Sequence, residues 1–367
     1  MDERIHDHAE TLVDWSARIE RGDDVVVHVG EGAHDLGVAV AAALGERGAT
    51  PISLYGSDEM ERAYLRAHDG EFVTPEVERT LYEQADSALF LRGTRNTTET
   101  ADVPDATQKS YAKATQAVRE ARLSTDWVST MHPTRALAQQ AGMSYEAYQE
   151  FVYGAILRDW EALAAEMAQL KTLLDEGSEV HLFKPDGTDL TLDIENRTAV
   201  NSAASVVYDS HNLPSGEVFT APADATGEIV FDLPMTIRGR RIRDARLTLK
   251  DGVVVEWDAT SGGELLETII ETDEGSRRFG ELGIGMNRGI TQMTDQILFD
   301  EKMAGTVHLA LGRAYDACLP EGETSVPSAV HVDLITDMRT EGSVMKIDGE
   351  VIQRDGLFRW EDEYTEE

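Results

Sequence analysis

The fold class of this chain is indicated first by residues 23–37, which read DDVVVHVGEGAHDLG. Val25 to Val29 form a continuous apolar run, which is the pattern of a strand buried on both faces. A glycine-containing turn follows, and Val38 to Leu44 has helical character. Residues 51–55 read as a second strand and complete a strand–helix–strand unit. Alternation of this kind predicts a parallel sheet covered by helices.

The pattern continues on both sides of this unit. Residues 5–21 have the apolar spacing of an amphipathic helix, and residues 87–93 and 127–130 read as further strands. Residues 144–175 read as one long helix that stops near Gly177. We therefore expect an α/β N-terminal domain with a Rossmann-like parallel sheet over residues 1–176.

The sequence changes character after Val180. Short alternating strands are separated by turn dipeptides such as the Asp-Gly pairs at 186–187, 251–252 and 348–349. An Asp-Gly pair between alternating apolar residues is a strong hairpin signal. Residues 177–367 are therefore predicted to form a second domain, mostly antiparallel, β-rich and of α+β class.

The Gly30-Glu31-Gly32 turn after the first strand invites comparison with a dinucleotide-binding loop. The full fingerprint requires a third glycine, and Asp35 stands in its place. Glu31 would also lie near the pyrophosphate of a dinucleotide. A tight turn is therefore the favoured interpretation, and an NAD-dependent oxidoreductase is a distant alternative.

Charge excludes several classes of partner. The chain has 33 Lys and Arg against 69 Asp and Glu, a formal net charge of -36. Nucleic acid and anionic membrane surfaces are disfavoured because both require a basic patch. The acidic residues are spread along the chain between regularly spaced apolar residues, so disorder is disfavoured and an acidic shell adapted to concentrated salt is expected.

Cysteine usage and apolar runs bear on location. Cys318 is the single cysteine, which rules out an internal disulfide. No stretch approaches the apolar run of about 20 residues that a membrane span needs. The first residues, MDERIHDHAE, lack the basic-then-apolar pattern of a signal peptide. We expect a soluble, cytoplasmic protein.

The C-terminal half concentrates side chains that suit hard metal ions. Glu217 lies beside a Pro/Gly turn, Glu281 in a small apolar stretch, and His308 inside an apolar run. His331 and Asp333 have strand spacing and project on one face. Imidazole and carboxylate together suit divalent ions such as Zn²⁺, Co²⁺ and Mn²⁺. Each residue alone also has an ordinary interpretation as a surface acid or a core histidine, so spacing supports only a possible metal hydrolase.

Four phrases in this half resemble the M29 family of metallopeptidases, the aminopeptidase T type. They are NLPSGEVFTAP (212–222), ELGIGMN (281–287), LFDEKMAGTVHLALGRAY (298–315) and SAVHVDLI (328–335). The resemblance also covers the N-terminal half, more weakly. It implies metal ligands at Glu217, Glu281, Glu301, His308, His331 and Asp333, with Tyr315 beside the metals. The segment between Glu301 and His308 is slightly longer than in bacterial members, which leaves the role of Glu301 less defined.

The resemblance further implies a metal-dependent aminopeptidase that acts on peptides as a homodimer. A water activated by two divalent ions (Zn, Co, Mn or Mg) would release N-terminal amino acids. Glu281 is the first choice for a carboxylate that bridges the ions. Glu301 or Glu281 would carry the proton, and Tyr315 would stabilise the oxyanion. The alternatives are a hydrolase of another amide or ester on the same fold and a non-catalytic metal-binding protein.

Overall fold

The computed structural model describes residues 2–237 and 240–365 of the chain. Internal contacts divide the chain into one unit of Met1–Trp160 with Ala204–Ser215 and a second of Glu161–Ala203 with Gly216–Glu367. The predicted boundary at residue 176 coincides with the end of helix α9 (Trp160–Glu176), whereas the contacts group most of that helix with the second unit.

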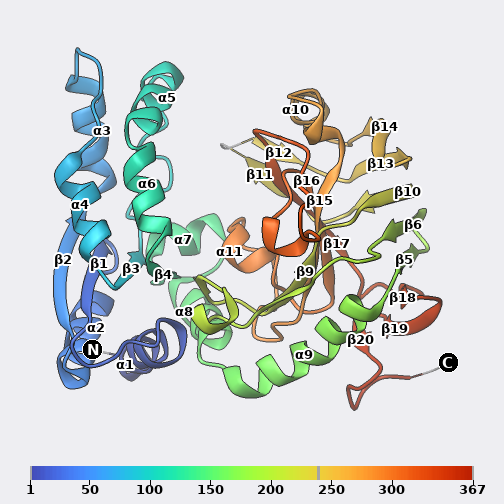
Figure 1. Cartoon of the computed structure of the whole chain (residues 1–367), viewed down its shortest axis with the longest axis horizontal. Helices are drawn as coiled ribbons and strands as arrows, with labels where there is room; N and C mark the ends of the chain where they lie inside the picture. Colours follow the sequence, from blue (N-terminus) through green and yellow to red (C-terminus); the bar gives the residue numbers. More distant parts are fainter. Residues whose placement is uncertain (1, 238–239, 366–367) are drawn as a thin grey trace. The chain divides into compact units, whose positions relative to one another are not determined.

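The first unit is built on a five-stranded sheet in the order β2-β1-β3-β4-β8. Strands β1 to β4 of this sheet are labelled in Figure 1. Every neighbouring pair in this sheet is parallel, which confirms the predicted α/β class. The strands are β1 (Asp24–Gly30), β2 (Thr50–Gly56), β3 (Ser87–Arg92), β4 (Asp126–Met131) and β8 (Asn212–Leu213).

Helices connect these strands and bury their apolar residues against the sheet. Val26, Ala88 and Phe90 of the sheet form one buried cluster with Tyr82 and Val118 from two of the helices. The helices of this unit are α1 (Glu3–Glu10), followed directly by a π-helical turn (Thr11–Ser16), α2 (His34–Arg47), α3 (Asp58–Ala67), α4 (Glu76–Gln84), α5 (Asp105–Ala114), α6 (Gln116–Leu123), α7 (Arg135–Gln140) and α8 (Tyr145–Ile156).

The glycine turn after β1 has a packing role. The backbone N–H of Gly32 donates to the carbonyl of Gly93 at 2.8 Å. A Cβ at Gly32 would lie 2.7 Å from that same carbonyl oxygen, so a side chain would push the two loops apart. This contact supports the tight-turn interpretation of the sequence.

The single helix predicted over residues 144–175 is wrong, because the chain breaks between α8 and α9. Leu157 leaves the helical region with φ -85° and ψ 64°. The indole N–H of Trp160 then donates to the carbonyl of Ile156 at 2.8 Å. This side-chain bond satisfies one of the carbonyls that a helix end leaves open.

The second unit holds two larger antiparallel sheets, which confirms the predicted β-rich class. One has the order β14-β13-β10-β6-β5-β18-β19-β20 and the other β17-β16-β15-β9-β7. The rings of Phe231 and Phe279, one from each sheet, lie 6.3 Å apart and edge to face. Besides most of α9, the described residues of this unit include two short α-helices, α10 (Gly263–Ile270) and α11 (Ile297–Asp300).

The strands of the first of these sheets are β5 (Glu179–Lys184), β6 (Thr188–Asp193), β10 (Asp224–Phe231), β13 (Ala245–Lys250), β14 (Val253–Asp258), β18 (Val344–Ile347), β19 (Glu350–Arg354) and β20 (Leu357–Phe358). Those of the second are β7 (Val200–Ser202), β9 (Glu217–Thr220), β15 (Phe279–Gly285), β16 (Thr306–Gly312) and β17 (His331–Asp337). A separate two-stranded ribbon joins β11 (Met235–Ile237) to β12 (Arg240–Ile242).

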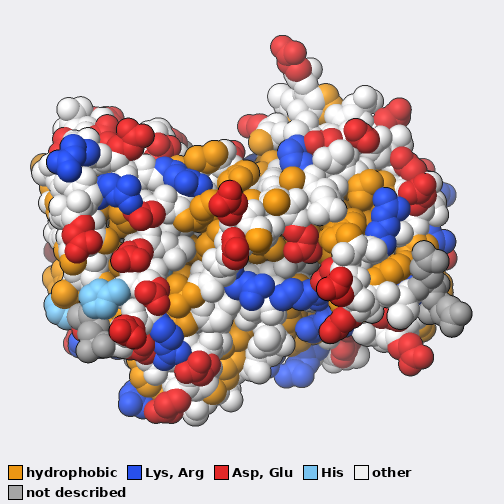
Figure 2. Space-filling view, turned by 90° about the horizontal axis from the view of Figure 1, so that it is seen from below, with side chains coloured by type: hydrophobic (Ala, Val, Ile, Leu, Met, Phe, Trp, Pro, Cys, Tyr) orange, Lys and Arg blue, Asp and Glu red, His pale blue; other side chains and the backbone are white. Residues whose placement is uncertain are grey.

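The surface reflects the acidic composition. On the face that Figure 2 shows, Asp and Glu side chains are scattered, with Lys and Arg side chains between them. Cys318 is buried and carries a free thiol. Within the described residues, none of the helices has the length and apolar character needed to cross a bilayer.

Candidate metal site

Four neighbouring strands of the five-stranded antiparallel sheet bring together five of the predicted ligands. These are Glu217 on β9, Glu281 on β15, His308 on β16, and His331 and Asp333 on β17. Glu281 and Asp333 both pair with Ala310 of the strand between them. The small side chain of Ala310 leaves space over the sheet, so the two carboxylates can approach the same region.

The five side chains form two groups that share Glu281. One group is Glu217, Glu281 and His308, and the other is Glu281, His331 and Asp333. One oxygen of Glu281 lies 3.3 Å from Nε2 of His308, and the other lies 3.2 Å from Nε2 of His331. Glu281 is 5% exposed. The two groups are therefore joined through the two oxygens of one buried carboxylate.

Backbone carbonyls orient both imidazoles. Nδ1 of His308 lies 3.0 Å from the carbonyl oxygen of Glu301, and Nδ1 of His331 lies 2.9 Å from that of Arg313. A carbonyl oxygen can only accept a hydrogen bond, so Nδ1 carries the proton in each ring. In the neutral rings, Nε2 then presents its lone pair toward the carboxylates, as a metal-binding histidine requires.

The charges of the cluster depend on one another. Burial alone would lower the pKa of His308, but the hydrogen-bonded Glu281 and the charge of Glu217 outweigh it and raise the pKa to about 10. Burial raises the pKa of Glu217 to about 7. Burial, with the charge of Glu301, also raises the pKa of Asp333, to about 6. The carboxylates thus exceed the positive charge available to them, so the cluster favours a bound proton or cation.

The donor set fits a divalent metal ion. Oε2 of Glu217 is buried and has no hydrogen-bond partner among the residues that the structure describes, although it lies 3.6 Å from Nε2 of His308. A buried carboxylate oxygen without a partner is costly unless something positive binds it. Imidazole nitrogen and carboxylate oxygen together are the donors that Zn²⁺, Co²⁺ and Mn²⁺ use.

The structure places the sixth predicted ligand, Glu301, differently. Its carboxylate forms an ion pair with Nζ of Lys302 and belongs to neither group among the described residues. The backbone carbonyl of Glu301 nevertheless orients His308. A direct role of the Glu301 carboxylate in metal binding stays a prediction.

Lys302 is a site residue that the sequence analysis did not identify. Its side chain is completely buried, and Nζ lies 3.4 Å from Oε1 of Glu217. Burial alone would lower its pKa, but the charges of Glu217 and Glu301 outweigh burial and raise it. The only signal in the sequence is its place between Glu301 and an apolar run, in a chain where lysine is scarce.

Tyr315 lies at the edge of the cluster. Its ring meets that of His331 edge to face at 5.2 Å and tilts against Phe219 at 5.5 Å. The side chain is 43% exposed. The structure therefore brings Tyr315 beside the second group, where the family resemblance expects a tyrosine.

Two glycines of β15 make room for the site. A Cβ at Gly283 would lie 2.0 Å from Cε1 and Nε2 of His308, which pairs with it across the sheet. A Cβ at Gly285 would lie 2.1 Å from the carbonyl oxygen of Met303. The glycines of the ELGIGMN phrase therefore admit the imidazole of His308 and the backbone segment that carries Lys302.

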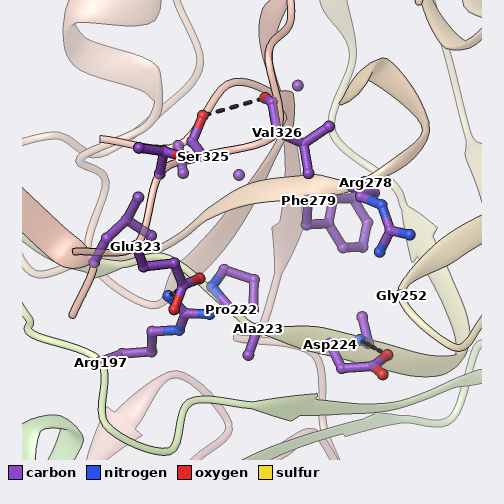
Figure 3. A pocket seen from close by; sticks show the side chains of 16 residues that line it. Arg197, Pro222, Ala223, Asp224, Gly252, Arg278, Phe279, Glu323, Ser325 and Val326 are labelled. Carbon is purple, nitrogen blue, oxygen red and sulfur yellow. Dashed lines mark hydrogen bonds and ion pairs between the residues drawn. The ribbon is translucent and has the colours of Figure 1, made fainter. Parts of the chain in front are cut away.

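A separate pocket in the second unit, of about 100 Å³, shows a different chemistry. Figure 3 shows Arg197 and Glu323 on one side of this pocket and Arg278 on the other. The guanidinium of Arg197 pairs with Glu323 at 2.8 Å. The pocket lining, taken over the described residues, includes none of the predicted ligands and not Tyr315.

The fold and the donor set define a metalloenzyme that combines a parallel α/β unit with an antiparallel β-rich unit. The chain belongs to the family described as thermophilic metalloprotease (M29), whose sequence model matches residues 1–358. This confirms the resemblance carried by the four phrases and places the chain among metallopeptidases.

The named relatives are aminopeptidases. Aminopeptidase 2 of Geobacillus stearothermophilus is 32% identical over 182 residues, which cover 44% of this chain and 43% of that relative. Aminopeptidase AmpS of Bacillus subtilis is 24% identical over a match that covers 97% of each chain. The match thus covers less than half of aminopeptidase 2 and nearly all of AmpS.

Two solved structures share the fold. AmpT from Thermus thermophilus has a TM-score of 0.83 at 24% identity, over 97% of this chain and 99% of its own. A 2,5-dihydroxypyridine dioxygenase from Pseudomonas putida KT2440 has a TM-score of 0.57 at 15% identity, over 98% and 97%. Because the fold is shared with a dioxygenase, the fold alone does not fix the reaction.

Proposed function

We propose that this chain is an aminopeptidase that releases N-terminal amino acids from peptides, with two divalent metal ions held by the groups that share Glu281. The position of Glu281 carries the proposal, since its two oxygens face the Nε2 atoms of different histidines at 3.3 and 3.2 Å. Two cations about 3.5–4 Å apart require a bridging anion between them. The position of its two oxygens supports Glu281 as that anion.

Each remaining residue has a role that its position supports. Divalent ions held here would supply a Lewis acid for the peptide carbonyl and an activated water. Glu301, whose carboxylate lies beside the site, is the candidate that carries the proton to the leaving amine. Tyr315, in contact with His331, is the candidate that donates a hydrogen bond to the oxyanion.

Peptides are favoured as substrates by the family and by the names of the relatives. The family is a metalloprotease family, and the relatives that match this chain are named aminopeptidases. Removal of single residues from the free N-terminus is therefore the activity to test first. A hydrolase of another amide or ester on the same fold is the second candidate.

The substitution Glu281→Gln tests directly whether the charge of Glu281 is needed for activity. The substitution keeps the shape of the side chain and removes the negative charge that joins the two groups. We expect hydrolysis of aminoacyl p-nitroanilides to fall below detection while circular dichroism and thermal unfolding stay close to wild type. Full activity in Glu281→Gln would contradict the proposed role of Glu281 between the two metal ions.

Glu256→Gln is a matched control, because Glu256 is an exposed carboxylate on β14 of the same unit. Its activity should equal that of wild type. A panel of aminoacyl anilides, simple amides and esters, each with and without chelator, separates the candidates. Chelator-sensitive cleavage of only the amides or esters that lack an amino-acid residue would favour the second candidate. Bound metal without chelator-sensitive hydrolysis of any substrate would indicate a non-catalytic protein.

A further inference from the structure

A buried lysine among the predicted metal ligands is an unusual feature of this site. Lys302 is completely buried, and its ion pairs in the described part of the chain are to Glu217 and Glu301. Lysine is rarely buried without a partner that needs its charge. Its ammonium is a positive charge fixed among carboxylates that would otherwise bind metal.

The backbone holds this lysine in place. The carbonyl of Lys302 accepts from the N–H of Asn287 at 3.0 Å, and Ala304 donates back to the carbonyl of Asn287 at 3.3 Å. Gly285 lets this segment approach β15, since a Cβ there would collide with Met303. The segment is therefore anchored at the end of β15, which fixes the backbone from which the Lys302 side chain reaches Glu217.

The two groups differ in their exposure to this charge. Nζ lies 3.4 Å from Oε1 of Glu217, which belongs to the group with His308. Apart from the shared Glu281, the other group consists of His331 and Asp333, which pair with each other at 3.6 Å. Coulomb repulsion between an ammonium and a divalent ion acts strongly over such short distances in a buried site. The charge of Lys302 also acts on Asp333, but its ion pairs among the described residues are with Glu217 and Glu301. The ammonium therefore repels an ion in the His308 group more directly than an ion in the His331 group.

We propose that Lys302 makes the two metal positions unequal, so that the position formed by Glu217, Glu281 and His308 binds a divalent ion more weakly than the position formed by Glu281, His331 and Asp333. This inference rests on the proposed two-metal function and adds the order in which the positions fill. The expected difference in dissociation constant is about tenfold or more, the scale on which groups next to metal ligands act.

A titration of the metal-free protein with Co²⁺ tests the inference without an activity assay. Equilibrium dialysis with elemental analysis counts the ions bound per chain, and visible absorption of Co²⁺ reports the ligands of each. We expect one ion to bind first and a second to bind about tenfold or more weakly. Two ions bound with equal affinity in the wild-type chain would overturn the inference, whatever the variants do.

Lys302→Met removes the charge and keeps a long unbranched side chain. We expect it to strengthen the second binding step about tenfold while the first changes little. Lys302→Arg, which keeps the charge, should preserve the unequal binding. An unchanged or weakened second step in a folded Lys302→Met would contradict the inference.

Lys184→Met is the matched control, because Lys184 is also completely buried but pairs with Asp232 and Asp186 instead. It should leave both binding steps unchanged, and a change equal to that in Lys302→Met would also contradict the inference. A failure of this inference can be distinguished from a failure of the proposed function. Equal binding with chelator-sensitive peptidase activity rejects only the role of Lys302, whereas unequal binding without hydrolysis rejects only the activity.

Discussion

The imidazole of His308 depends on the absence of a side chain at one neighbouring residue. Gly283 lies across from it, and the space that a Cβ would need there is filled by the ring itself. The carbonyl of Glu301 also orients the ring by accepting a hydrogen bond from Nδ1. The position of Nε2 is thus fixed on two sides before any ion binds.

Gly283→Ala should displace this ring and weaken metal binding about 10- to 100-fold, as the loss of an orienting contact does. Equilibrium dialysis with Zn²⁺ measures the change, and circular dichroism checks that the sheet remains. Gly263→Ala is the control, since a Cβ at Gly263 would meet nothing within 4 Å. Wild-type affinity in a folded Gly283→Ala would show that the ring does not need this space.

Five of the site residues could be predicted because they lie in strand patterns and in segments that resemble the M29 family. All five meet in space as expected: Glu217, Glu281, His308, His331 and Asp333. The burial of Lys302 was not predicted, because lysine is normally exposed and its place between Glu301 and an apolar run does not by itself indicate a buried side chain. Its side chain pairs with Glu217 and Glu301, and its carbonyl accepts from the N–H of Asn287, contacts that only the folded chain shows.

Strands β1, β5 and β6 show the burial that their sequence patterns predict, while two features of the fold leave no local pattern. Strand β8 has two residues and pairs with β4, far away in the sequence, so it leaves no local pattern. The break after α8 contains Leu157, Arg158 and Asp159, with neither glycine nor proline to mark it. It is made by the non-helical Leu157 and by the indole bond of Trp160.

A second buried lysine ties three elements of the β-rich unit together. Nζ of Lys184, on β5, lies 2.7 Å from Asp232 after β10 and 2.9 Å from the hydroxyl of Thr336 on β17. Lys184→Met would leave Asp232 without this partner. Because the Asp232 side chain is 33% exposed, water would offset part of the loss.

We expect Lys184→Met to lower the free energy of unfolding by about 2 kcal/mol, below the range for a fully buried pair. Urea denaturation followed by circular dichroism measures this change. Lys346→Met is the comparison, since Lys346 is a partly exposed lysine on β18 of the same sheet. Equal stability of the two variants would show that the Lys184 network adds nothing.

The net charge of the whole chain is expected to determine how its stability depends on salt. A formal charge of -36 spread over the surface repels itself in dilute buffer. The Debye length falls from about 10 Å at 0.1 M salt to about 3 Å at 1 M, so added salt relieves this repulsion. Adaptation to concentrated salt follows as a prediction from charge alone and is independent of the fold.

The melting temperature should therefore rise by several degrees between 0.1 and 2 M NaCl. Differential scanning calorimetry at fixed pH measures it, and sucrose in place of salt serves as the uncharged control. The rise in salt should exceed any rise in sucrose and should flatten once screening is complete. A melting temperature that stays constant or falls with NaCl would contradict an acidic shell that salt stabilises.

We propose that a metal pair joined by Glu281 removes residues from a free N-terminus. Mass spectrometry of one short peptide, offered with a free and with an acetylated N-terminus, tests it most directly. We predict stepwise loss of N-terminal residues from the free peptide only, abolished by chelator and restored by a divalent ion. Cleavage of the acetylated peptide at an equal rate, or cleavage that chelator leaves unchanged, would contradict the claim.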